Sequence, residues 1–216
     1  MKIEALHEFH NKDFSKGWAD RFTPTPPRIE LFETILERIK TLGDSSCHIV
    51  ELGIGPGYLA HFLLSRLENI TYEGVDYALP MLDLAAERLS EFKDRTTFTQ
   101  ADLTDPNWIN AIRQPKAIVT TWALHDLFNA DNILSVYQNT QKVLIENGIF
   151  LNGDFIKPDL VEFEYEAGRL EKNTHLDLLQ LAGFQSIDCI KEFEKNIDQP
   201  TTSNNYACFE ARKFSK

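Results

Sequence analysis

Three closely spaced glycines follow an apolar run in the segment Val50-Glu51-Leu52-Gly53-Ile54-Gly55-Pro56-Gly57-Tyr58. The residues Cys47–Leu52 have the composition of a short buried strand, and the residues from Pro56 to Leu67 have the apolar spacing of a helix. Glycines between a strand and a helix let the chain turn tightly and let a ligand approach the backbone closely. A tight turn that binds no ligand needs the same glycines. The segment therefore predicts a ligand site only together with the residues that follow the neighbouring strands.

Strand-like and helix-like segments alternate along the chain beyond this turn. Further strands are expected at Thr71–Asp76, Thr97–Gln100, Ala117–Thr121 and Ile149–Phe155. The segments Leu79–Phe92 and Ile133–Leu144 repeat apolar residues at helical spacing. Strands that alternate with helices form a parallel sheet with helices on both faces.

The C-terminal part departs from this alternation. A helix at Thr174–Leu181 is followed by two strand-like runs, Ser186–Phe193 and Tyr206–Lys213, with a polar connection and no helix between them. Consecutive strands without a crossover helix pair antiparallel. We therefore expect an α/β, Rossmann-like fold whose seven-stranded, mostly parallel sheet ends in a C-terminal antiparallel hairpin.

Residues 1–45 precede the sheet and are not needed to build it. They contain a helical start from Ile3 to about Phe14, a proline cluster, and an amphipathic helix that stops at Gly43. We expect residues 1–45 to form a helical lid or cap and residues 46–216 to form the ligand-binding domain. Simple packing against the sheet is the alternative role of the N-terminal segment.

Composition and charge disfavour several classes of protein. The chain has 216 residues, of which 43% are hydrophobic and 25% charged, the balance of a soluble globular protein. Its 22 Lys and Arg stand against 33 Asp and Glu, a net charge of -11, which disfavours nucleic acid as a partner. No apolar run approaches the ~20 residues of a membrane helix, and the N-terminus lacks the apolar core of a secretory signal. We expect a cytoplasmic monomer or homodimer that meets a small molecule and no membrane.

The residue types that bind metals form no recognisable site. Cys47, Cys189 and Cys208 are widely spaced, contain no Cys-x-x-Cys pair, and are expected to be buried, reduced thiols. His7 and His10 can share a helix face, but no further ligand accompanies them. We therefore expect no metal.

Acidic residues end the second and third expected strands. Asp76 stands 19 residues after Gly57 (76 − 57), where a carboxylate accepts both hydroxyls of a ribose. Asp102 ends the third strand, where a carboxylate can accept an adenine amino group. Either acid would also serve as the cap of a surface turn. Because ligands bind at the carboxyl ends of parallel strands, the two acids together predict an adenosine site at this edge of the sheet.

The spacing of the glycines disfavours a dinucleotide. A dinucleotide fingerprint places its third Gly or Ala at the sixth position, and that position is Tyr58 here. Glu51 adds negative charge beside the turn, which suits the ammonium group of a methionine moiety better than a pyrophosphate. An NAD-dependent dehydrogenase is therefore the weaker alternative.

These residues resemble the class I S-adenosylmethionine-dependent methyltransferases, in particular those that act on small molecules. Glu51–Gly57 resembles the first motif of that family, Asp76 its ribose-binding acid, and Ala101–Leu103 its adenine-contacting segment. The segment Thr121–Asp126 resembles the motif after the fourth strand, often written Leu-His-His, with Asp126 in place of the second His.

The resemblance covers about residues 28–213 and implies S-adenosylmethionine as the cofactor and S-adenosylhomocysteine as its product. Residues expected to contact the cofactor are Glu51, Gly53, Gly55, Gly57, Asp76, Tyr77, Met81, Asp102, Leu103 and Thr121. Residues expected to line the acceptor pocket are Trp18, Arg21, Phe22, Trp122 and Phe155. His125 is the candidate general base or acceptor-orienting residue, with a structural His in the pocket wall as the alternative. Asp126 would orient His125 or cap the following helix.

The leading interpretation is a methyltransferase that acts on an unidentified small molecule by in-line methyl transfer. Two alternatives stay open. One is a methyltransferase that acts on tRNA or a protein, and the other is a non-catalytic S-adenosylmethionine-binding module.

Overall fold

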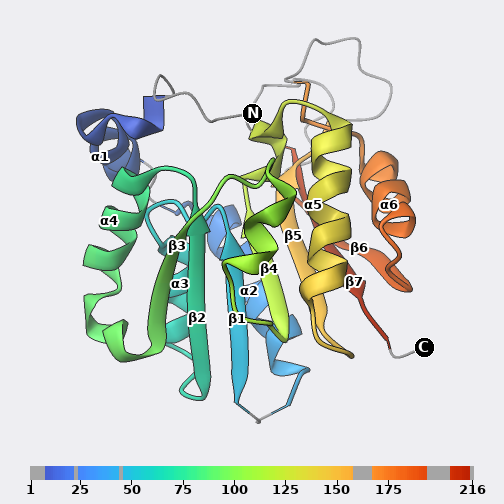
Figure 1. Cartoon of the computed structure of the whole chain (residues 1–216), viewed down its shortest axis with the longest axis horizontal. Coiled ribbons are helices and arrows are strands. Elements are labelled where there is room, and N and C mark those ends of the chain that lie inside the picture. Colours follow the sequence, from blue (N-terminus) through green and yellow to red (C-terminus); the bar gives the residue numbers. More distant parts are fainter. Residues whose placement is uncertain (1–7, 22–23, 44–45, 158–166, 194–204, 215–216) are drawn as a thin grey trace. The chain divides into compact units, whose positions relative to one another are not determined.

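The computed structural model describes residues 8–21, 24–43, 46–157, 167–193 and 205–214. The chain divides into two compact units, Met1–Arg113 and Gln114–Lys216. Seven strands form a mixed sheet, in the order β3-β2-β1 within the first unit and β4-β5-β7-β6 within the second (Figure 1). The predicted fold class is confirmed: a seven-stranded Rossmann-like sheet with helices around it and an antiparallel hairpin at its end.

The first unit contains a three-stranded parallel sheet. Its elements are η1 (Glu8–His10), α1 (Lys12–Arg21), α2 (Pro26–Lys40), β1 (Cys47–Leu52), α3 (Tyr58–Leu64), β2 (Ile70–Asp76), α4 (Leu79–Arg88), η2 (Ser90–Arg95), β3 (Thr96–Gln100) and η3 (Pro106–Asn110). β1 pairs with β2 up to Leu52↔Val75, and β2 pairs with β3 up to Asp76↔Gln100. Because the three strands are parallel, their carboxyl ends meet at one edge, where the glycine turn begins and Asp76 ends its strand.

The second unit contains the antiparallel hairpin. Its elements are β4 (Ala117–Thr121), η4 (Leu124–Leu127), α5 (Ala130–Val143), β5 (Ile149–Phe155), α6 (Lys172–Leu181), β6 (Ser186–Phe193) and β7 (Tyr206–Arg212). β4 runs parallel to β5, whereas β7 pairs antiparallel with both β5 and β6. β7 lies between these two strands and is buried from Tyr206 to Ala211, so the last strand of the chain is a core strand.

Capping asparagines explain two helix boundaries that differ from the expected ones. Asn11 Oδ1 accepts the N–H of Phe14 at 3.0 Å, so α1 begins at Lys12; it ends at Arg21, beyond the expected end near Phe14. Asn129 Oδ1 accepts the N–H of Asn132 at 2.9 Å, so α5 begins at Ala130. The expected helical start at Ile3 lies outside the described residues.

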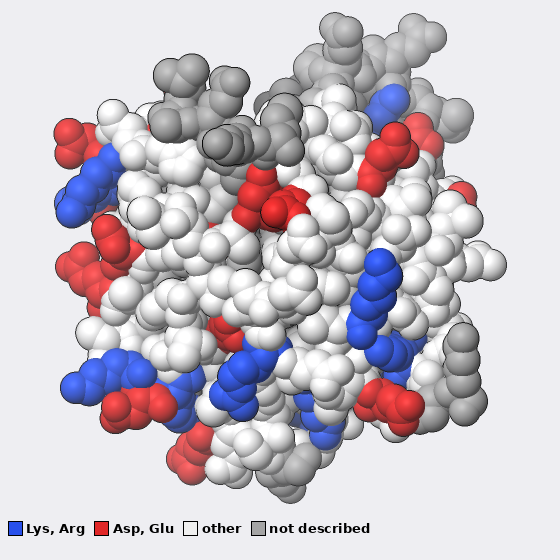
Figure 2. Space-filling view, in the orientation of Figure 1, with Lys and Arg blue, Asp and Glu red and all other residues white. Residues whose placement is uncertain are grey.

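The surface carries both charge signs. Figure 2 shows Lys and Arg side chains in small separate groups, with Asp and Glu side chains beside them, on the face that it presents. Within the described ranges, none of the helices combines the length and the apolar composition that crossing a membrane requires.

Gly57 offers a test of how the glycine turn is built. Its φ is +79°, and a Cβ at this position would lie 3.3 Å from the Cα and Cβ of Ala85 in α4. We expect Gly57→Ala to lower the free energy of unfolding by about 1–3 kcal/mol, because left-handed backbone and crowding both disfavour the methyl group. Urea unfolding monitored by circular dichroism measures the change.

Gly17→Ala is the matched control for this substitution. Gly17 lies inside α1, and a Cβ there would meet no atom within 4 Å. The control should leave stability unchanged or raise it by up to about 1 kcal/mol, because Ala favours helix over Gly. Equal effects of the two substitutions would contradict the proposed packing of Gly57 on α4.

Candidate functional site

The glycine turn is fixed to the end of β2 by backbone hydrogen bonds. The N–H groups of Gly53 and Ile54 both donate to the carbonyl oxygen of Val75, at 2.8 and 3.0 Å. Gly53 and Gly55 have φ values of +69° and +52°, a region that other residues rarely adopt. A Cβ at Gly55 would meet no atom within 4 Å, so open space lies beside the backbone here. The turn therefore leaves room for a ligand against its backbone.

A further glycine, Gly74 in β2, makes room for the turn itself. A Cβ at Gly74 would collide with the side chain of Ile54. Ile54 is buried, so its side chain occupies the volume that a larger residue in β2 would take. The need for glycine at position 74 was not predicted from the sequence, because it depends on the contact between Ile54 and β2.

Asp76 ties the glycine turn to the residues after β2. Its Oδ2 accepts the N–H of Gly55 at 2.9 Å, and its Oδ1 accepts the N–H of Ala78 at 2.9 Å. Burial raises the pKa of Asp76 to about 6, and the backbone N–H groups of Ala78, Gly55 and Tyr77 oppose that rise. The two carboxylate oxygens offer about four acceptor positions together, so Asp76 keeps acceptor capacity for a ligand.

Glu51 is a buried acid at the end of β1. Its side chain is 1% exposed, and its Oε2 accepts the hydroxyl of Tyr72 at 2.7 Å. Burial raises the pKa of Glu51 to about 8; the Tyr72 hydrogen bond lowers it and the negative charge of Asp76 raises it. Two buried acids therefore stand next to the glycine turn, and Glu51 is mainly neutral at pH 7.

Asp102 caps a turn with one of its two carboxylate oxygens. Its Oδ1 accepts both the N–H and the hydroxyl of Thr104, at 2.8 and 2.7 Å. Its Oδ2 accepts no hydrogen bond from the described residues, so one oxygen stays available to a ligand. Leu103 and Met81, two further predicted cofactor contacts, are buried.

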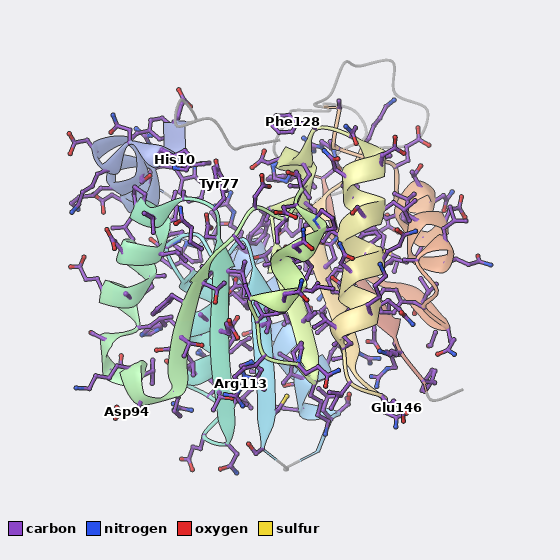
Figure 3. All side chains as sticks on the ribbon, viewed as in Figure 1. His10, Tyr77, Asp94, Arg113, Phe128 and Glu146 are labelled. Atoms are coloured by element: carbon purple, nitrogen blue, oxygen red, sulfur yellow. The ribbon has the colours of Figure 1, made fainter. Side chains whose placement is uncertain are left out.

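Two contacts join the N-terminal elements to this part of the first unit. The hydroxyl of Tyr58, at the start of α3, donates to the carbonyl of Ala19 in α1 at 2.9 Å. The ring of His10 meets the ring of Tyr77 edge-on, with centroids 5.1 Å apart, and Figure 3 shows these two side chains facing each other. α1 therefore contacts the helix that follows the glycines, and η1 contacts the residue that follows Asp76.

Three predicted acceptor contacts belong to this N-terminal segment. Trp18 is half-buried, with its ring edge-on to Phe9 at 5.4 Å between centroids, and Arg21 is exposed. Phe22 lies outside the described residues.

In the second unit, His125 is held by Asp154. The Nδ1 of His125 lies 2.7 Å from Oδ1 of Asp154, and the backbone N–H of His125 donates to Oδ2 at 2.9 Å. Asp154 is fully buried, which raises its pKa, but the charge and hydrogen bond of His125 together with the charge of His175 outweigh burial and hold the pKa below its usual range. An ionised carboxylate only accepts hydrogen bonds, so Nδ1 carries the proton and Nε2 is left as the basic atom.

Asp126 was the residue expected to orient His125, and Asp154 was not predicted from the sequence. Asp126 Oδ1 does reach the ring, 3.3 Å from Nε2, but its side chain is 60% exposed. Asp154 makes the shorter, buried contact from the end of β5, 29 residues away. An acid at the end of a strand, as at Asp76, was the signal that would have identified it.

Aromatic side chains surround His125 within the second unit. Its ring meets Phe155 edge-on, with centroids 4.9 Å apart, and Phe155 lies 6.5 Å from Trp122. Trp122 has a φ of +49° and donates its N–H to Gly153 at 2.9 Å, which fixes the chain directly after Thr121. The structure therefore brings together the predicted Trp122, His125 and Phe155.

Comparison with solved structures first identifies the fold. An O-methyltransferase family protein from Burkholderia thailandensis shares it and superposes with a TM-score of 0.72 at 15% identity, over 100% of this chain and 64% of that chain. Human N-acetylserotonin methyltransferase, solved in complex with S-adenosylmethionine, gives a TM-score of 0.66 at 17% identity, over 99% of this chain and 61% of that chain.

Sequence comparison then gives two partial matches. Residues 49–148 match the family model described as a methyltransferase domain. The release factor glutamine methyltransferase of Bacillus cereus is 31% identical over 84 residues, which make up 38% of this chain and 30% of that protein. The chain thus spans less than a third of the length of this curated relative.

A buried polar network lies on the same strand as Asp154. Asn152 Nδ2 donates to the hydroxyl of Tyr137 at 2.9 Å, and that hydroxyl lies 2.7 Å from Nδ1 of His175. Burial lowers the pKa of His175 to about 4, while the charge of Asp154 raises it. His175 is therefore neutral in the folded protein at pH 7 and links α6 to α5 through Tyr137.

His175 makes stability depend on pH. Its pKa is about 4 when folded and about 6.5 when unfolded, so its contribution is complete above pH 6.5 and is lost as the pH falls toward 4. We expect wild-type protein to lose about 2 kcal/mol relative to His175→Gln between pH 7 and pH 5. Urea unfolding of both proteins at each pH measures this difference.

A matched control for this prediction is His61→Gln, which removes a half-exposed histidine from α3. It should keep the pH dependence of the wild type. The same stability difference between wild type and His175→Gln at both pH values would contradict the prediction.

Proposed function

We propose that this chain is an S-adenosylmethionine-dependent methyltransferase that acts on a small molecule. The observation that carries the proposal is the bond from Gly55 N–H to the Asp76 carboxylate, which holds an open glycine turn beside a buried acid, within a segment of the methyltransferase domain family. The charge of -11 and the dispersed basic groups in Figure 2 favour a small acceptor over RNA.

The residues of the first unit fit this cofactor. Asp76 accepts the ribose hydroxyls through its remaining lone pairs, and Oδ2 of Asp102 accepts the adenine amino group. The turn from Gly53 to Gly57 receives the methionine end, near Glu51. Side chains of the first unit proposed to complete the site are Tyr77, Met81 and Leu103. The bound cofactor supplies a methyl group that is already activated as a sulfonium, so the protein has to position and deprotonate the acceptor.

His125 is proposed as the general base. With Nδ1–H donating to Asp154, Nε2 faces away from that bond and accepts the proton of an acceptor hydroxyl, thiol or carbon acid. The buried charge of Asp154 then stabilises the imidazolium, and Asp126 accepts from its Nε2–H. Aromatic rings of Trp122 and Phe155 exclude water around the imidazole.

The N-terminal residues 1–45 are proposed to cap the site. The contacts of Tyr58 with Ala19 and of His10 with Tyr77 attach η1 and α1 to the glycine turn region, and Trp18, Arg21 and Phe22 would contact the acceptor from this segment. We also propose a cytoplasmic location, because Cys47 and Cys208 are buried thiols, as proteins of a reducing compartment retain.

A protein acceptor is the second candidate function. It is favoured by the partial match to the release factor glutamine methyltransferase, whose name describes a protein substrate. Formation of S-adenosylhomocysteine with a panel of small hydroxylated and amine compounds, with glutamine-containing peptides and with tRNA distinguishes the acceptor classes.

Cofactor binding is the first prediction of this proposal. Calorimetric titration should show micromolar binding of S-adenosylmethionine and S-adenosylhomocysteine and none of NAD. Asp76→Ala should weaken binding at least tenfold, because two hydrogen bonds to a charged group are worth about 1.5–3 kcal/mol each. The control is Asp105→Ala, which removes an exposed cap bonded to Asn107 and should leave affinity unchanged. Binding of NAD alone, or of no ligand, would overturn the proposal.

Turnover is the second prediction. His125→Ala should lower kcat about 10²–10⁴-fold and leave the Kd for S-adenosylmethionine within a factor of about two. Asp154→Asn should lower kcat by a smaller factor and alter the pH profile, because Asp154 acts through His125. His61→Ala is the matched control, and full activity of His125→Ala on a verified acceptor would contradict the assignment of the base.

A further inference from the structure

Glu51, Tyr72 and Asp76 lie on one face of the sheet. Glu51 pairs in register with Gly74 of β2, and residues two apart on a strand point to the same face. Tyr72 and Asp76 therefore flank Gly74 on the face that Glu51 shares. The carboxyl group of Glu51 accepts the Tyr72 hydroxyl and also lies within the influence of the Asp76 charge.

These two buried acids differ in how they are stabilised. Asp76 accepts backbone N–H groups from Gly55 and Ala78, whereas among the described residues Glu51 accepts only the neutral phenol of Tyr72. In the described parts of the chain, no Lys or Arg forms an ion pair with either acid. A second buried negative charge beside Asp76 is unfavourable, so Glu51 holds a proton in the ligand-free protein. The pKa of about 8 for Glu51, against about 6 for Asp76, agrees with this geometry.

We propose that Glu51 is a proton-linked cation site, in which binding of the positively charged methionine end of the cofactor expels the Glu51 proton and Tyr72 holds the resulting carboxylate. This inference rests on the proposed function. The O–H bond of the carboxylic acid breaks, the proton passes to solvent, and the carboxylate charge then faces the charge of the ligand. Tyr72 is a positioning residue, because it touches Glu51 and acts through it.

Tyr72 is suited to hold the Glu51 carboxylate because its hydroxyl keeps its proton and donates a hydrogen bond. Burial and the charge of Glu51 hold the pKa of Tyr72 well above its usual range, so the phenol never competes for the proton. Glu51, Tyr72 and Asp76 are the titratable groups that act on one another here among the described residues. The pH dependence of binding below pH 8 therefore reports mainly on Glu51.

The proposal sets the pH dependence of affinity. A free-state pKa of about 8 makes the Kd for S-adenosylmethionine fall roughly eightfold from pH 6.5 to pH 7.5, as the carboxylate becomes easier to form. Across this range Asp76 is mostly ionised, and the α-amino group of the ligand, with a pKa of about 8, is mostly charged.

The test counts protons. Titration calorimetry of S-adenosylmethionine at pH 7.0, in phosphate and in Tris, gives the number of protons released from the difference in buffer ionisation enthalpy. We expect about 0.9 proton per cofactor for the wild type and about zero for Glu51→Gln, whose affinity should not vary with pH. Tyr72→Phe should bind at least tenfold more weakly at pH 7.0 and regain affinity as the pH rises.

Tyr58→Phe is the matched control, because it removes a phenol that bonds to a backbone carbonyl in the same unit, and it should keep the wild-type proton count. If Tyr72→Phe fails to show cooperative unfolding, Glu51→Gln decides the question. Binding without proton release by the wild type, or with unchanged release by Glu51→Gln, would overturn this inference and leave the proposed function standing. An absence of cofactor binding from pH 6 to pH 8.5 would overturn both.

Discussion

The hydrogen bond from the Gly55 N–H to the Asp76 carboxylate is the constraint on which the first unit depends. It joins the turn after β1 to the end of β2, and the second oxygen of Asp76 holds Ala78 at the start of the next helix. The left-handed glycines are stable in this place because the N–H groups of Gly53, Ile54 and Gly55 donate to β2, at the Val75 carbonyl or the Asp76 carboxylate. These hydrogen bonds fix the turn to the sheet, and they hold the open space beside Gly55 in place.

In the second unit a buried acid near the end of a strand also accepts backbone N–H groups, but its pKa shifts in the opposite direction. Asp154 ends β5 as Asp76 ends β2, and both carboxylates are buried against N–H donors. The pKa of Asp76 is raised because burial outweighs its neutral donors, whereas the pKa of Asp154 is lowered because His125 contributes positive charge as well as a hydrogen bond. A buried acid therefore holds a backbone turn in one unit and an imidazole in the other.

The fold and part of the site were predictable from the sequence, because local patterns encode them. The glycine spacing, the acid at Asp76 and the two consecutive strand-like runs near the C-terminus are recognisable from neighbouring residues alone. The partners of His125 and Glu51 depend on strand register instead: Asp154 and Tyr72 are distant in sequence and lie in runs that read simply as buried strand. Periodicity predicts on which face of the sheet a side chain lies, but not which side chain of another strand it contacts.

Glu51 and His175 connect the architecture to its pH dependence. Both are neutral at pH 7 in the folded protein for the same reason, burial, yet they act in opposite directions. The raised pKa of Glu51 means that stability is lost as the pH rises from about 4.5 toward 8, while the lowered pKa of His175 means that stability is lost as the pH falls from about 6.5 toward 4. These two groups together favour the ligand-free fold most at mildly acidic pH. A cation bound at the glycine turn removes the Glu51 part of this balance, because it makes the ionised carboxylate the favoured form. Burial without a neighbouring cation is therefore what makes the stability of the first unit fall as the pH rises through neutrality.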